Sequence, residues 1–185
     1  MVRALVLSLA LLATGCASTP GAQPHARIAE DVQLTLPLPP AYPETRTIVQ
    51  TARAHYGDRQ GALEAVVSLS PTRVVIVLTA LSGPRLATIT WDAKGVRAER
   101  ALIAPEGVPV ENILADIFVT VWPAEAVAAA LPEGVTLSVV EGARSIRRGD
   151  QLIVEVIPDA TDPARTLVRN RAFGYELTIV SQTVP

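Results

Sequence analysis

The chain has 185 residues and a mass of 19.6 kDa, which suits one domain with a short appendage and excludes a second large domain. Hydrophobic residues make up 49% of it, charged residues make up 18%, and the formal net charge is -2. This composition excludes a disordered chain, which needs few apolar residues and a high net charge. The isoelectric point of about 5.7 gives no basic field to attract phosphates, so we expect no nucleic-acid partner.

The N-terminus has the pattern of a signal peptide. Arg3 precedes an apolar run over residues 4–13. This run is too short to remain as a membrane span, because a helix needs about 20 apolar residues to cross the hydrocarbon. We therefore predict a signal peptide over residues 1–15, and the cysteine that follows it indicates the signal peptide of a lipoprotein.

The single cysteine follows this run directly. The segment Leu12–Cys16 resembles a bacterial lipobox, with Ala13 where leucine is more common. We predict that Cys16 is lipidated, and acyl chains at about 0.8 kcal/mol per buried methylene would make a stable anchor. Ala17, in place of aspartate, indicates the outer membrane in Gram-negative sorting. Residues 16–31 are predicted to be a lipidated flexible tether. An ordinary cleaved signal with an incidental cysteine is the alternative.

Most of the remaining chain predicts short strands separated by turns, a pattern typical of antiparallel sandwiches or barrels. The first strand, Val32–Leu36, ends at a group of prolines, which cannot donate to a strand ladder. Residues 46–56 and 61–69 flank a turn bounded by glycines and predict a hairpin. Three more strands, over residues 73–81, 85–92 and 96–101, continue this part of the chain as a meander.

The hydrophobic period changes after Pro105. Apolar residues recur at three- and four-residue steps between Pro109 and Pro123 and predict an amphipathic helix. A second short helix is predicted from Pro123 to Leu131. Alternating apolar residues then predict further strands, with turns at Gly142, Gly149-Asp150, Asp162-Pro163 and Phe173-Gly174. The pattern gives about eleven strands, with both helices after the sixth.

The sequence contains no catalytic pattern that we recognise. A nucleophile elbow, a zinc-protease helix, a glycine-rich phosphate loop and a paired-cysteine motif are all absent. We expect no enzymatic activity, no cofactor and no metal site. The two histidines, His25 in the tether and His55 near a strand end, are predicted to be solvated.

Two charged features allow more than one interpretation. Asp116 lies on the polar face of the first helix, so we predict a solvated position, with a buried ion pair to Arg144 or Arg147 as the alternative. Arg144, Arg147 and Arg148 form the main cationic cluster. They are candidates for contact with anionic lipid headgroups, and protection of an edge strand by charge is the alternative.

Three segments that follow the lipobox in order resemble the LolB-like outer-membrane lipoproteins. They are Leu81–Asp92, the helix Glu111–Phe118 with Trp122–Glu125, and Phe173–Ile179. The chain is similar to an uncharacterised branch of these proteins, often found near aryl-polyene and fatty-acid-type biosynthesis genes. The resemblance spans most of residues 32–184.

The resemblance implies a fold for residues 32–185. Proteins of the LolA/LolB type form a half-open antiparallel β-barrel with a helical lid over an apolar cavity for acyl chains. The residues that would line the cavity or its lid are Trp91, Ile113, Leu114, Ile117, Phe118, Val121, Trp122 and Tyr175. The same residues would also suit an ordinary packed core. Leu81, in a turn between strands, would be the apolar residue that enters the membrane, unless it ends a buried strand.

The resemblance also implies a function. We expect a periplasm-facing, outer-membrane-anchored lipoprotein that binds acyl chains and serves the localisation or transfer of lipoproteins or lipids, aryl-polyene-type lipids among them. The expected partners are the outer membrane, through lipidated Cys16, an acyl-chain or lipoprotein cargo, and a soluble LolA-like carrier; the protein itself is expected to be a monomer. The alternative is a non-enzymatic assembly or interaction lipoprotein with a solid core, which docks an envelope transporter or a secretion component.

Overall fold

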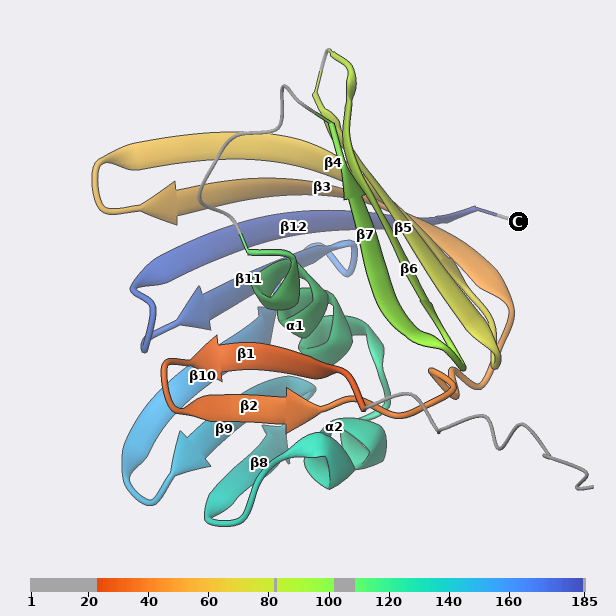
Figure 1. Ribbon diagram of the computed structural model, residues 1–185. Coiled ribbons are helices and arrows are strands. Elements are labelled where there is room, and N and C mark those ends of the chain that lie inside the picture. Colours follow the sequence, from red (N-terminus) through yellow and green to blue (C-terminus); the bar gives the residue numbers. More distant parts are fainter. Residues whose placement is uncertain (1–22, 82, 102–108, 185) are drawn as a thin grey trace, which may run out of the picture.

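The computed structural model describes residues 23–81, 83–101 and 109–184, and this part of the chain is mainly β with two short helices (Figure 1). The elements are β1 (His25–Ala29), β2 (Val32–Thr35), β3 (Arg46–Tyr56), β4 (Arg59–Leu69), β5 (Arg73–Ala80), β6 (Arg85–Asp92), β7 (Gly95–Arg100), α1 (Val110–Val121), α2 (Ala124–Ala130), β8 (Val135–Val140), β9 (Ala143–Arg148), β10 (Gln151–Pro158), β11 (Arg165–Asn170) and β12 (Tyr175–Val184).

Ten of these strands form one antiparallel sheet in the order β7-β6-β5-β4-β3-β12-β11-β10-β9-β8. Two meanders, β3 to β7 and β8 to β12, join where the last strand pairs with β3 along its whole length. β7 and β8 are the two edges, so the sheet is open. It bends around α1 (Figure 1). β1 and β2 form a separate hairpin.

Alternation along the strands gives the sheet a buried inner face. Val74, Ile76 and Leu78 are buried on β5, and their cross-strand neighbours on β6 include the buried Ile89 and Trp91. α1 lies against this inner face, and β1 packs on α1. The hydrophobic core therefore lies between the sheet, α1 and the β1–β2 hairpin.

The first element of the fold corrects the predicted tether. Residues 25–31 were assigned to the tether, but β1 pairs with β2, and Ala26 and Ile28 are 0% and 1% exposed. The apolar residues Ala26, Ile28 and Ala29 are too few to predict a strand, and their burial depends on contacts with α1, β2 and β10. With β1 counted, the helices follow the seventh strand. His25 begins β1 and is exposed, as His55 is on β3.

The other elements agree closely with the sequence pattern. β3 and β6 have the predicted bounds, and α1 lies within residues 109–123. The predicted signal peptide and Cys16 lie outside the described residues. Within the described ranges, no helix has the length and apolar character to cross a membrane.

Candidate functional site

The part of the inner face that lies against α1 is filled by aromatic rings. Trp91 from β6 stacks on Trp122, which follows α1, with 5.1 Å between ring centroids, and Phe118 of α1 lies 5.2 Å from Trp122. All three side chains are fully buried. Trp91 Nε1 donates to Pro37 O and Trp122 Nε1 donates to Pro40 O, both at 3.0 Å. The proline-rich segment after β2 thus fixes both indoles and closes this end of the core.

The predicted cavity residues divide into two groups. Trp91, Leu114, Ile117, Phe118 and Trp122 are buried in the packed core, while Ile113, Val121 and Tyr175 are partly exposed. The residues of the first group therefore form an ordinary packed core, which was the alternative to a cavity lining. The second group keeps some exposed surface.

Beyond α1, the inner face continues along the β3–β4 hairpin as a row of small and aliphatic side chains. We call this row the inner strip, and it consists of Ala52, Ala54, Leu63, Ala80 and Leu177. The register places these residues on one face, since Ala52 pairs with Leu63, Leu63 with Ala80, and Ala54 with Leu177. All five are partly exposed. Tyr56, which is 57% exposed, ends the strip.

A polar network begins at Tyr175, which pairs with Tyr56 at the end of the inner strip. The Tyr175 hydroxyl donates to Asp116 Oδ1 at 2.7 Å. Asn170, which is buried, donates through Nδ2 to Ile28 O at 2.9 Å and to the Tyr175 oxygen at 3.4 Å. The network thereby connects α1, the C-terminal strands and the β1–β2 hairpin.

The position of Asp116 corrects both sequence interpretations. Its carboxylate lies among protein atoms beside Tyr175, although the residue keeps some exposed surface, and no described cation pairs with it. Burial raises the pKa of Asp116 from 3.8 to about 7, while the hydrogen bond from Tyr175 acts in the opposite direction. Helical periodicity correctly predicts that Asp116 lies on the polar face of α1. The periodicity of one helix cannot predict that Tyr175 of β12 lies over that face.

The three arginines of the cationic cluster have different surroundings. Arg144 donates through Nη1 to the carbonyl oxygens of Val119 and Trp122, at 2.7 and 2.8 Å, and so caps the C-terminal end of α1. Arg148 forms an ion pair with Asp31. Arg147 is exposed and donates to Asp150 O. Since β9 lies between β8 and β10, these residues are not on an edge strand, and Arg147 remains the most accessible candidate for a headgroup contact.

Leu81 lies immediately after β5, in the turn toward β6. Its side chain is 49% exposed, and Gly83 N donates to Ala80 O at 3.2 Å across this turn. The alternative that Leu81 ends a buried strand is therefore wrong. The structure places an exposed leucine at a hairpin tip, which is the geometry that membrane insertion would need.

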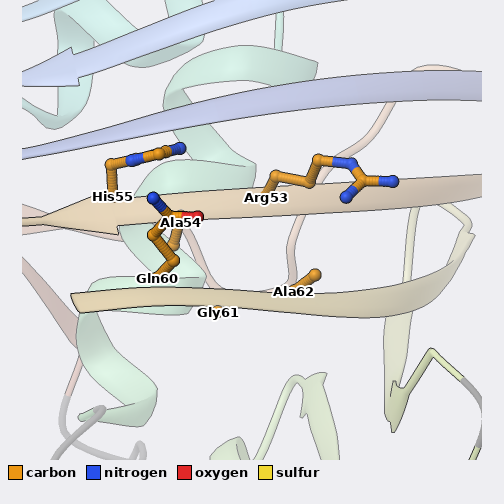
Figure 2. A pocket seen from close by; sticks show the side chains of 6 residues that line it. All are labelled: Arg53, Ala54, His55, Gln60, Gly61 and Ala62. Carbon is orange, nitrogen blue, oxygen red and sulfur yellow. The ribbon is translucent and has the colours of Figure 1, made fainter.

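The described surface also has two hollows, the first of which shares Ala54 with the inner strip. One of about 270 Å³ is formed at the β3–β4 hairpin by Arg53, Ala54, His55, Gln60, Gly61 and Ala62 (Figure 2). Another of about 230 Å³ lies among Ile157, Pro158, Asp159, Arg165, Leu167 and Thr178. Most of the residues around the first hollow are exposed and several are polar, so it does not resemble an apolar ligand cavity. The described residues contain no group of three side chains that could hold a metal ion.

A family model described as "Protein of unknown function (DUF3261)" matches residues 47–183. The chain therefore belongs to this family. The match runs from β3 to β12 and so includes the whole ten-stranded sheet and both helices, whereas the β1–β2 hairpin precedes it. No curated protein matches the sequence.

Proposed function

We propose that this protein is a LolB-like outer-membrane lipoprotein that faces the periplasm and binds acyl chains for the localisation or transfer of lipoproteins or lipids. In this proposal lipidated Cys16 is the anchor, the open ten-stranded sheet is a half-open barrel, and α1 is part of its lid. The function is non-enzymatic transfer, in which an acyl chain moves between apolar surroundings, so the net free-energy change is small.

The inner strip is the observation that carries this proposal. Its aliphatic side chains are partly exposed on the concave side of the sheet, whereas the aliphatic and aromatic side chains of the core on that face are buried. Alanine and leucine side chains present a surface without hydrogen-bonding groups, which suits a flexible acyl chain. Leu81 at a hairpin tip supplies an apolar contact for a bilayer.

Two alanines of one hairpin provide a matched test. Ala54 lies on the inner strip, while the exposed Ala62 projects from the other face of the same hairpin, where it pairs with Arg53. Envelopes of a bacterial host that expresses the full-length chain would be incubated with a photoactivatable fatty acid and irradiated. Labelled peptides would then be identified by mass spectrometry.

We expect labelling of peptides from β3, β4 or β12, reduced about tenfold by Ala54→Glu, which corresponds to about 1.4 kcal/mol of binding free energy. Ala62→Glu should leave the labelling unchanged. Equal labelling in both variants, or no label in these strands, would argue against the inner strip as the binding surface. Leu81→Asp should preserve labelling and reduce delivery of the labelled chain to vesicles.

The packed aromatic cluster favours a second candidate function. With Trp91, Phe118 and Trp122 fully buried, the protein also suits a solid-core interaction lipoprotein that docks an envelope transporter or secretion component. This candidate predicts no labelling by the fatty acid in any variant. It predicts instead that the protein is recovered with a protein partner after cross-linking in the envelope.

A further inference from the structure

The two edges of the ten-stranded sheet differ in chemistry. The β7 edge has the charged residues Arg97, Glu99 and Arg100, and Arg97 also pairs with Asp92 on β6. Charged side chains on an edge strand discourage pairing with another chain. β8 has the sequence Val-Thr-Leu-Ser-Val-Val, which contains no charge and no proline. Only the β8 edge therefore lacks the usual protection against strand addition.

The hairpin geometry shows which groups of β8 face outward. Glu141 and Gly142 form a two-residue turn with φ of 50° and 83°, so Val140 and Ala143 are a hydrogen-bonded pair. Hydrogen-bonded pairs alternate along an antiparallel ladder, so the main-chain groups of Leu137 and Val139 point away from β9. No main-chain group elsewhere in the described ranges bonds to them.

The side chains near this edge are also accessible. Val139 is 48% exposed and Val140 is 68% exposed, and both follow the part of β8 that packs near α2. The edge therefore combines outward N–H and C=O groups with exposed β-branched side chains, which is the combination that strand addition uses.

We propose that the β8 edge is an interaction surface on which a second copy of this chain pairs antiparallel, so that the two ten-stranded sheets become continuous. With Ser138 on the twofold axis, Leu137 lies opposite the partner's Val139, and Val139 lies opposite the partner's Leu137. Each of these pairs exchanges two main-chain hydrogen bonds. The inference is independent of acyl binding, and it replaces the monomer expected from the sequence.

The sequence of β8 is self-complementary in this register, and this argues for a second copy as the occupant. Thr136 lies opposite the partner's Val140, and Ser138 lies opposite the partner's Ser138. Every facing pair is thus apolar or hydroxylated, and no like charges meet. A low net charge of -2 adds little repulsion between copies.

Because Ser138 would lie on the twofold axis, a cysteine at this position allows the proposed dimer to be tested by disulfide cross-linking. Ser138 and the partner's Ser138 form a non-hydrogen-bonded pair, whose Cα atoms are about 4.5 Å apart. This separation lies within the range that a disulfide spans. Envelopes containing the full-length chain with Ser138→Cys would be treated with a mild oxidant and examined on a non-reducing gel. The wild-type chain, whose single cysteine is Cys16, gives the background, and Ala98→Cys on the exposed β7 edge is the matched control.

We expect a cross-linked species of twice the chain mass for Ser138→Cys, at least tenfold above that of Ala98→Cys. Adding Val139→Lys to Ser138→Cys should abolish it, because two lysines would lie near the shared edge. Adding Val184→Lys, at an exposed position on β12, should leave it unchanged. Circular dichroism of the lysine variants confirms folding.

Three results of the cross-linking comparison would overturn the proposal. They are no dimer from Ser138→Cys, equal dimer from Ala98→Cys, and persistence of the dimer with Val139→Lys in a folded chain. A cross-linked product whose mass requires a different protein would also overturn it, since the edge would then accept another partner. A concentration-dependent dimer of the purified full-length chain, lost in Val139→Lys and kept in Val184→Lys, supports it independently.

Discussion

At the scale of single residues, Asp116 is a carboxyl group whose environment differs strongly from that of an exposed side chain. Its pKa of about 7 in the folded chain exceeds the ordinary value of 3.8, so the native state holds more protons than the unfolded state between these values. The free energy of unfolding therefore decreases as the pH rises from about 4 to above 7. The protonated carboxyl group of Asp116 makes its full contribution to the free energy of unfolding below about pH 4. This contribution is lost as the pH rises through about 7.

Asp116→Asn should remove this dependence. The amide still accepts the Tyr175 hydrogen bond and carries no charge to desolvate, so we expect the variant to be more stable than the wild type at pH 8 and to differ less at pH 5. Urea denaturation at both pH values measures this. Asp31, Asp92 and Asp159 have lowered pKa values and act only at more acid pH. Parallel pH profiles for both chains would contradict the prediction.

At the scale of secondary-structure elements, Arg144 determines how α1 ends. Its guanidinium supplies hydrogen bonds to two carbonyl oxygens at that end, and the charge is favourable there because of the helix dipole. Arg144→Met should reduce the free energy of unfolding by about 1.5–3 kcal/mol, the contribution of hydrogen bonds from a charged donor. Arg147→Met should change it by less than about 0.5 kcal/mol. Equal effects in urea titrations would show that Arg144 does not cap α1.

The β1–β2 hairpin makes a second prediction at this scale. Ile28 is buried against α1, whereas the neighbouring Arg27 is exposed. Ile28→Ala should therefore cost about 2–5 kcal/mol, while Arg27→Ala should be nearly neutral. Thermal or urea unfolding of the two variants measures the difference. If residues 25–31 were a tether, both substitutions would be neutral.

Most elements could be predicted because their patterns are local. β3 shows two-residue alternation with a glycine turn after it, and α1 shows the helical period over three turns between prolines. β1 does not follow from the sequence, because its three buried residues, Ala26, Ile28 and Ala29, form too short a pattern to predict a strand. Arg144 was read as surface charge because its partners, Val119 and Trp122, come close only when β9 reaches α1.

At the scale of the whole molecule, the predicted lipid anchor makes a testable statement about localisation. In a Gram-negative host, the wild-type chain should fractionate with the outer membrane. Cys16→Ser should lose lipidation and leave that fraction, because two or more acyl chains are needed for a stable anchor. Ala17→Asp is the matched variant, and we expect it to keep the lipid and move to the inner membrane. Recovery of Cys16→Ser in the outer membrane would contradict lipid anchoring.

The sequence alone determined the order of the strands and helices from β2 onward, predicted a lipobox at Leu12–Cys16 and contains no catalytic motif that we recognise. These properties depend on residue type, spacing and period. Only the tertiary structure decided that the sheet is open, that Trp91 and Trp122 stack, and that Asp116 is covered by Tyr175. It also decided that the β8 edge is the uncharged one. The physical reason is that curvature, strand order and burial arise from contacts between residues far apart in the chain, which no local pattern records.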